Sequence, residues 1–324
     1  MDNKPGNIQS NKRKGTFLTR LLFFILIVFA ADLLTGETLR YYYFRQESGQ
    51  LYRTTYSVDS TGAEALIFGS SRANHHYKPG VLADRLGIQV YNAGREGNFI
   101  FYHYAVLSAV LERYTPELII LDFVRGEFMY NGASYDRLSG LLPYYRSHPE
   151  MRETIRLKSR FEPLKLISRI YPFNSMVLTI AAANAGFYDS EEVENGYVPL
   201  YGEWEEELVA ETEPEIYEID SVALETYRSF LEDCVSAGID VYVFCSPVFV
   251  DYSYDDLSVA MGRRIAGELG VSFIDLTSEP EFTSDPGLYW DVYHLNDRGA
   301  KKYSEMVSDI ISGEKNRNNN INIE

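Results

Sequence analysis

The fold is decided by the stretch AEALIFGSSR, residues 63–72. Its apolar run ends at Gly69, which is typical of a buried strand that leads into a tight turn. A serine on such a turn exposes its hydroxyl above the sheet, beside the free backbone N–H groups of the next helix. Ser71 is therefore a candidate nucleophile, although an ordinary turn with a helix N-cap has the same pattern.

Four more apolar runs have the length of strands, and helical patterns separate them. The strands are expected at 87–92, 117–123, 239–244 and 271–275, and the helices at about 79–86, 98–114, 221–237, 254–269 and 298–311. Strands that alternate with helices indicate βαβ crossovers, and hence an α/β fold with a five-stranded parallel sheet. Ligands of such sheets bind beyond the carboxyl ends of the strands.

The N-terminus combines a basic head with an apolar segment. Residues 1–20 hold five basic side chains and one acid, and Leu21–Ala31 contains no polar residue. We expect a cytoplasmic head at 1–15 and an uncleaved transmembrane anchor at 16–35. A cleaved signal peptide is the alternative. Both interpretations export the rest of the chain, because basic flanks stay in the cytoplasm.

The rest of the chain is acidic. The formal net charge is −17, so that the residues after the basic head carry −21. Nucleic-acid binding is not expected, because phosphates need a basic surface. We expect a connector at 36–60 and a domain at 61–313, with an insertion at 130–215 that caps the active edge of the sheet. An Asn-rich tail at 314–324 is expected to be disordered.

Two further motifs carry polar residues. Residues 92–98, NAGREGN, hold two glycines that let the backbone approach a ligand, but they lack the Walker lysine and the dinucleotide fingerprint. Near the C-terminus, Asp291 and His294 are three residues apart, so that one helical turn can place them on the same side. The carboxylate can then hold one imidazole nitrogen while the other faces a nucleophile.

The motifs together resemble the blocks of the SGNH/GDSL hydrolase superfamily, over about 64–127 and 220–311. The run Gly69-Ser70-Ser71 is similar to the family's Gly-Asp-Ser block, with Ser70 in place of Asp, and Asp291-x-x-His294 is similar to its last block. Gly97 aligns with a glycine whose N–H helps to form the oxyanion hole.

This resemblance implies a flavodoxin-like three-layer sandwich, the SGNH fold. It also implies a catalytic triad of Ser71, Asp291 and His294, and an oxyanion hole made by the N–H groups of Ser71 and Gly97. This sequence departs from the family in the third block. That block usually supplies an Asn side chain, whereas residues 122–127 read DFVRGE. Asn98 and Arg125 are candidates for substrate or oxyanion support in its place.

No metal or other cofactor is expected. The neighbours His75 and His76 should point apart on a helix or strand, and no carboxylate lies near them in sequence. His103 is expected to be an ordinary surface or packing residue, as is His148. The two cysteines, Cys234 and Cys245, have no metal-binding spacing. Buried free thiols are favoured for them, and a disulfide is the alternative.

The resemblance implies acyl chemistry outside the cytoplasm. The architecture is similar to the membrane-anchored SGNH proteins of alginate O-acetylation and teichoic-acid D-alanylation. Ser71 is then expected to take an acyl group and to pass it to a hydroxyl of a cell-envelope or exported glycan, or to water. A multi-span membrane acyltransferase is the partner that this interpretation suggests. A secreted lipase or esterase, and an inactive module that binds glycan or scaffolds a complex, are the alternatives.

The basic head predicts the orientation of the chain. Protease added to intact cells or spheroplasts should digest the acidic body and leave residues 1–15 protected, because the Lys/Arg-rich flank stays inside. Immunoblots against a tag at each end measure both fates. A body that resists digestion until the membrane is breached would contradict the orientation.

Overall fold

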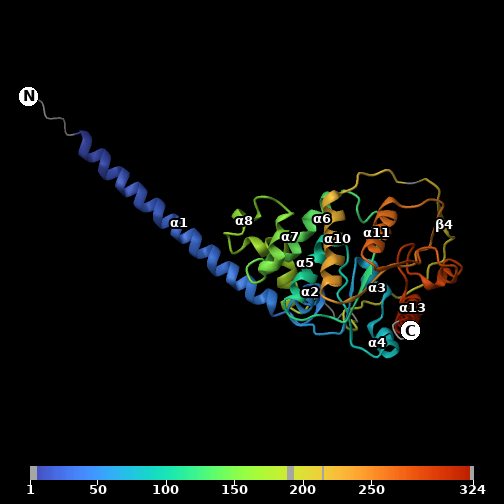
Figure 1. Cartoon of the computed structure of the whole chain (residues 1–324). Helices are drawn as coiled ribbons and strands as arrows, with labels where there is room; N and C mark the ends of the chain where they lie inside the picture. Colours follow the sequence, from blue (N-terminus) through green and yellow to red (C-terminus); the bar gives the residue numbers. More distant parts are fainter. Residues whose placement is uncertain (1–5, 188–192, 214, 322–324) are drawn as a thin grey trace, which may run out of the picture. The chain divides into compact units, whose positions relative to one another are not determined.

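The protein is described here by a computed structural model of residues 6–187, 193–213 and 215–321 (Figure 1). The chain divides into two compact units. The anchor unit consists of the chain up to Gln46 together with Ser159–Phe187, and the sheet unit consists of Glu47–Lys158 with the chain from Tyr188 onwards. The two units are considered separately below.

A five-stranded parallel sheet forms the centre of the sheet unit, as the sequence predicts. The strand order is β2-β1-β3-β5-β7. The strands are β1 (Ala65–Phe68), β2 (Val90–Asn92), β3 (Leu118–Asp122), β5 (Asp240–Cys245) and β7 (Ser272–Asp275). All five residues of the central strand β3 are buried, which is expected of a parallel sheet that is covered on both faces.

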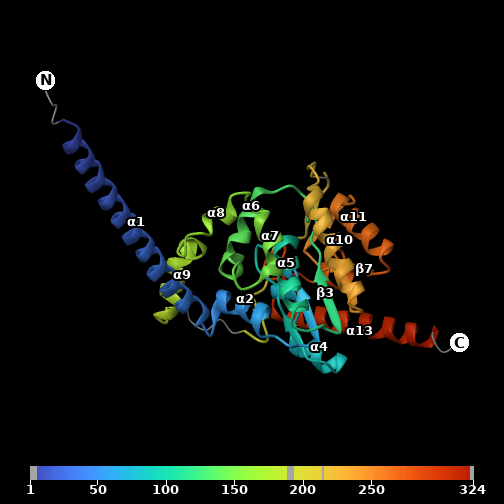
Figure 2. The ribbon, with the colours of Figure 1, turned by 60° about the vertical axis from the view of Figure 1, so that its left-hand side comes forward.

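Helices cover both faces of the sheet. On one face, α5 (Ile100–Leu111) packs against α10 (Ser221–Ser236), and Phe68 of β1 contacts Phe230 of α10 (Figure 2). On the other face, α4 (Pro79–Leu86) packs against α13 (Asp297–Ile321). The expected three-layer α/β sandwich of flavodoxin-like strand order is therefore confirmed. The order reverses between β1 and β3, and ligands bind at such switch points.

The remaining elements of the sheet unit are short. They are α2 (Gly49–Asp59), α3 (Ser71–His76), α6 (Gly132–Arg137), η1 (Leu138–Tyr144), η2 (Pro149–Met151), α7 (Arg152–Arg156), α11 (Leu257–Glu268), α12 (Pro280–Thr283), η4 (Pro286–Leu288) and the strands β4 (Val209–Glu211) and β6 (Val250–Tyr252). The parallel pair of β4 and β6 was not predicted. β4 lies in a run of acidic residues that begins at Glu203.

The segment expected as a connector is helical. Helix α1 (Gly6–Phe44) runs through the first part of this segment. Helix α2 packs against α5, where Thr54 and Tyr102 share a hydrogen bond of 2.9 Å. The guanidinium of Arg113 donates to the carbonyls of Ser57, Val58 and Thr61 and so fixes the end of α2. The compact sheet unit thus begins near Glu47, not at residue 61.

The expected disordered tail is wrong for residues 314–321, because α13 continues through them. Extending a formed helix costs less than nucleating one, so an Asn-rich sequence can continue it. Two contacts hold the first of these turns. Ser272 donates to the carboxylate of Glu314, and Lys315 lies 3.2 Å from that of Asp240. Residues 322–324 lie outside the described residues.

The insertion at 130–215 is divided between the two units. Its middle part, Ser159–Phe187, belongs to the anchor unit and holds α8 (Glu162–Lys165), η3 (Tyr171–Met176) and α9 (Val177–Asn184). The anchor unit also holds α1 (Gly6–Phe44), whose part from Gly15 is long and apolar enough to be a membrane span or a signal sequence. The expectation that the insertion caps the active edge of the sheet stays a prediction.

Three of the predicted packing residues are placed by the fold. Cys234 and Cys245 are both buried and free, so the favoured alternative is confirmed over a disulfide. His103 is buried on α5 against Phe68, and neither of its ring nitrogens makes a hydrogen bond of normal geometry to a described residue. Burial lowers the pKa of His103 to about 4. The nearby Asn98 carbonyl raises this pKa, but it offsets the effect of burial only in part.

Replacing His103 with Phe should stabilise the protein in acid. The unfolded chain protonates this imidazole below about pH 6.5, whereas the folded chain does so only near pH 4. The free energy of unfolding therefore falls as the pH drops through this window, by roughly 3 kcal/mol in all. His103→Phe should remove this loss, as urea unfolding at neutral and acidic pH would measure.

His148 is the control, because its pKa is shifted in the opposite direction to that of His103. His148 lies 3.0 Å from the Asp59 carboxylate, and this contact raises the pKa of His148. Its contribution is therefore present in acid and is lost as the pH rises through the folded pKa. His148→Gln should destabilise the protein mainly in acid. An equal response of both variants to pH would contradict the assignment of His103.

Candidate active site

The Gly-Ser-Ser turn places Ser71 at the carboxyl end of β1. Gly69 has φ +140°, and a Cβ there would come within 2.8 Å of the Asp122 carbonyl oxygen and of the Ala73 Cβ. Only glycine fits this position without strain. The chain therefore turns sharply into α3, whose first residue is Ser71. The N–H of Ser71 is one of the unpaired donors of a helix start.

His294 and Asp291 meet Ser71 in a chain of contacts. Nε2 of His294 lies 2.8 Å from Oγ of Ser71, and its Nδ1 lies 2.9 Å from both carboxylate oxygens of Asp291. The spacing of the pair had suggested a helical turn. Both residues instead lie in the loop before α13. Asp291 closes this loop by accepting from the N–H groups of Tyr293 and His294.

The electrostatics keep Asp291 charged. Burial alone would raise the pKa of its carboxyl group, but the hydrogen bonds from His294 and from the two N–H groups hold this pKa below its usual value. An ionised carboxylate only accepts hydrogen bonds, so that Nδ1 of His294 carries a proton. Nε2 is then free to accept from Ser71, which is the geometry of a general base.

The loop after β2 lies against the Ser71 turn. The N–H of Arg95 donates to the Gly69 carbonyl (2.9 Å), and the Asn92 amide donates to the carbonyls of Ala73 and Tyr77. Gly97 has φ +67°, and a side chain there would meet the guanidinium of Arg137. Neither Gly97 nor Ser71 donates its N–H to the backbone of the described residues. Both donors are available to a ligand by this criterion.

The two residues considered as support have partners of their own. The side-chain amide of Asn98 donates to the carbonyl of Glu96 (3.1 Å). The guanidinium of Arg125 stacks on Tyr252, 3.8 Å from the ring centroid, and donates to the Tyr254 carbonyl. These contacts occupy Arg125 at β6. Support of an oxyanion by either residue stays a prediction.

His75 and His76 both lie beside His294, which the sequence did not predict. Their ring centroids are 5.8 and 6.2 Å from that of His294. His75 donates from Nδ1 to the Val198 carbonyl, and burial lowers its pKa. Its position one helical turn after Ser71 could have indicated this proximity. A neutral His75 adds no positive charge next to His294.

His76 fixes the loop that carries His294. The N–H of Leu295 donates to Nε2 of His76 (3.0 Å), so that Nδ1 holds the proton and donates to Oγ of Ser246 (3.0 Å). Complete burial, followed by the charge on His294, lowers the pKa of His76 well below its usual value. The ring is therefore a neutral bridge from α3 to the residue that follows His294.

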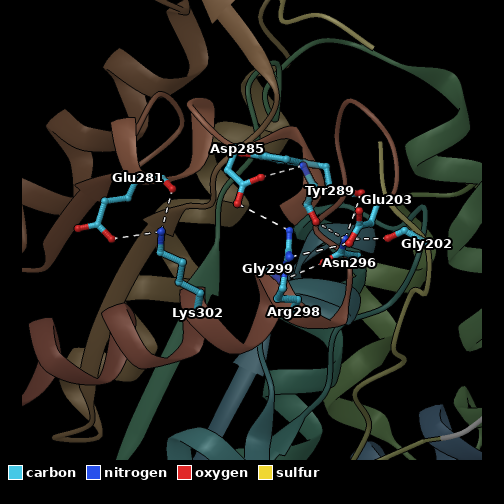
Figure 3. Close-up of polar contacts among 10 residues, drawn as sticks. Gly202, Glu203, Glu281, Asp285, Tyr289, Asn296, Arg298, Gly299 and Lys302 are labelled. Atoms are coloured by element: carbon cyan, nitrogen blue, oxygen red, sulfur yellow. Dashed lines mark hydrogen bonds and ion pairs between the residues drawn. The ribbon is translucent and has the colours of Figure 1, made fainter. Parts of the chain in front are cut away.

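Asn296 also holds this loop (Figure 3). Its buried amide donates to the carbonyls of Gly202, Gly287 and Tyr289, at 2.7, 2.8 and 3.3 Å. Arg298 lies on the same segment, 3.8 Å from Glu203 and 3.7 Å from Asp285. Exposed ion pairs of this kind contribute little, whereas a buried amide that loses three acceptors is costly. Asn296 therefore dominates the placement of the loop.

A cavity of about 370 Å³ opens where α2 meets the end of β2. It is lined by Glu47, Ser48, Gly49, Tyr52, Arg53, Tyr56, Tyr91, Val193, Asn195 and Gly196. The Tyr56 and Tyr91 rings are 4.8 Å apart. Asn195 accepts from the N–H of Asn92, the residue that fixes α3. The cavity thus adjoins the loop that lies against Ser71.

Metal ligands are not grouped in the part of the chain that the structure describes. No set of three or more His, Cys, Asp or Glu side chains there could hold a metal ion.

Comparisons with known proteins give little further information. No family model matches the chain, and no curated protein matches it. Among solved structures, an acetyl xylan esterase, AlAXEase, is similar, with a TM-score of 0.38 and 13% identity. The match covers 77% of this chain and 98% of the esterase.

Proposed function

We propose that this protein is an extracytoplasmic serine acyltransferase or acyl esterase that acts on O-acyl groups of a cell-envelope or exported glycan. In this proposal Ser71 is the nucleophile, His294 the general base and Asp291 the residue that orients the base. The observation that carries the proposal is the continuous set of contacts from Oγ of Ser71 through the His294 ring to the Asp291 carboxylate.

The chemistry follows from these contacts. Oγ of Ser71 attacks the acyl carbonyl while Nε2 of His294 takes its proton, and Asp291 stabilises the imidazolium. The N–H groups of Ser71 and Gly97 are the proposed donors to the oxyanion. His294 returns the proton to the leaving alcohol, which leaves an acyl ester on Ser71. A sugar hydroxyl or water then attacks this ester, with His294 again as the base.

The proposed location rests on α1 and on the basic head. Helix α1 is continuous from Gly6 to Phe44. Its Asp32 is bonded to the hydroxyl of Ser168 and to the N–H of Arg169. The proposal takes this helix as an uncleaved anchor. A multi-span membrane acyltransferase as supplier of the acyl group is part of the same proposal.

Substitutions in the three residues test the catalytic assignment. Ser71→Ala and His294→Ala should each lower the turnover of a small acetyl ester roughly 10⁴-fold or more, and the double variant should add little, because the residues act as a unit. Asp291→Asn should cost less, because the imidazole is still present. Steady-state turnover and labelling by a fluorophosphonate probe measure both losses.

The neighbouring serine is the matched control. Ser70 lies on the same turn and precedes the proposed nucleophile, so Ser70→Ala should retain most activity and probe labelling. Loss of activity in Ser70→Ala but not in Ser71→Ala would move the nucleophile by one residue. Turnover and labelling that survive both substitutions would rule out a serine of this turn as the nucleophile. If the unsubstituted protein shows neither turnover nor labelling, the alternative of an inactive glycan-binding module is favoured, in keeping with the missing Asn of the third block.

The cavity beside β2 supports a glycan as the substrate. Its lining combines three tyrosine rings with the charged and amide groups of Arg53, Glu47 and Asn195. Tyrosine rings offer flat apolar faces with a polar tip, and sugars present apolar C–H faces ringed by hydroxyls. Such cavities hold ligands from about 300 Å³ upwards.

Tyr52→Ala should therefore separate large substrates from small ones. Removing one aromatic contact should lower the deacetylation of an O-acetylated oligosaccharide roughly three- to tenfold. Hydrolysis of a small acetyl ester should stay unchanged, because it does not reach the cavity. Tyr130→Ala is the control, since Tyr130 is 61% exposed and does not line the cavity. Equal losses on both substrates would count against the cavity as a glycan site.

A further inference from the structure

The segment Ser159–Phe187 is fixed to α1 by partly buried polar contacts. The Asp32 carboxylate of α1 accepts from the hydroxyl of Ser168 and from the N–H groups of Arg169 and Ile170. A Cβ at Gly36, one turn further along α1, would collide with the backbone of Arg169. Only glycine permits this approach, so the segment follows α1 as one body.

One set of apolar side chains in this segment forms a small core with α1. Phe173 lies against Tyr43 of α1, with ring centroids 5.6 Å apart, and the Asn184 amide donates to the Tyr42 carbonyl. Leu166, Met176 and Ile180 are also buried. The core of the anchor unit is therefore formed without the other apolar residues of this segment.

A second set of apolar side chains points outward. Leu164 is 66% exposed, Ile167 65% and Leu178 85%, and Phe161 and Val177 are exposed beside them in sequence. We call these five residues the apolar surface. Apolar groups gathered on one short segment usually mark contact with a membrane or a partner. Ile167 directly precedes the three residues that bind Asp32, and Leu164 lies one helical turn before the first of them.

The charge of the segment differs from that of the chain. Ser159–Phe187 holds the basic residues Arg160, Lys165 and Arg169 and one acid, Glu162, so that it carries +2 in a chain of −17. Glu162 is buried and paired with Lys165. Exposed apolar side chains beside basic ones are the composition of segments that lie in the headgroup region of a membrane.

The position of Asp32 sets the depth of the apolar surface. At 1.5 Å per residue, 16–35 spans about 30 Å, the thickness of the hydrocarbon core. Asp32 lies near the outer end of this span, and the exposed Tyr41 and Tyr42 follow it, as aromatic residues do at an interface. The segment bonded to Asp32 is thereby held at the boundary between acyl chains and headgroups.

We propose that the apolar surface lies in the outer leaflet of the membrane that α1 spans, with its basic residues among anionic lipid headgroups. This inference rests on the proposed anchoring by α1. Lipid is favoured over a protein partner because the segment is fixed at the depth of the interface and carries +2, whereas the chain as a whole carries −17. Docking of a membrane protein on the same residues is an outcome of the test.

The test uses the full chain in lipid nanodiscs without any partner protein. Single cysteines at Leu164, Ile167 and Leu178 carry an environment-sensitive fluorophore, and lipids brominated near the top of the acyl chains act as quencher. The unsubstituted chain is the labelling blank, because both native thiols are buried. Phe24→Cys on α1 reports on the anchor, and Val235→Cys on α10 is the matched control, an exposed apolar residue of the sheet unit.

The proposal expects the brominated lipid to quench the three labels on the apolar surface and the label at 24, and to leave the label at 235 bright. Quenching at 24 alone would overturn the proposal while leaving the anchor intact, and would favour a protein partner for these residues. Absence of quenching at 24 as well would overturn both. Quenching at 235 equal to that at 164 would also overturn it, because lipid contact would not be specific to this surface.

Discussion

The arrangement of the site depends on one buried side chain, the guanidinium of Arg72. It donates to the Phe123 carbonyl after β3 (2.9 Å) and to the Ser246 carbonyl after β5 (3.4 Å), and lies 3.6 Å from the Asp122 carboxylate. Burial raises the pKa of Asp122, and the charge of Arg72 opposes this rise. Removing one partner of such a pair costs about 3–5 kcal/mol, because a charge is left buried alone.

These contacts connect the ends of three neighbouring strands directly beneath the nucleophile. Arg72 follows Ser71, so the residue that ties β1 to β3 and β5 also sets the direction in which α3 leaves the sheet. The Tyr77 hydroxyl donates to the remaining oxygen of Asp122 and closes α3 from its other end (2.8 Å). Contacts in the core, and not the surface loops, therefore hold Ser71. The same contacts give the short helix α3 a rigid position.

The sequence predicted the elements whose signal is local. The five strands could be predicted because each is a short apolar run bounded by turns. Ser71 could be predicted because the glycine at 69 permits the turn that carries it. Asp291 and His294 were recognised by their spacing and order in the chain, although the helical turn expected for them is a loop. The bonds of His76 to Ser246 and of Asn296 to Gly202 join residues distant in sequence, and no local pattern indicates them. The two-unit division and the continuation of α13 depend on packing in the same way.

The distance in sequence between the two halves of the candidate site has a consequence for biosynthesis. Ser71 and His294 are 223 residues apart, and His294 lies close to the last helix of the chain. A chain that is synthesised from its N-terminus presents Ser71 long before His294 exists. The contact between Oγ of Ser71 and Nε2 of His294 can therefore form only after synthesis has passed residue 294. A shortened product that lacks residue 294 keeps the hydroxyl but not its imidazole partner.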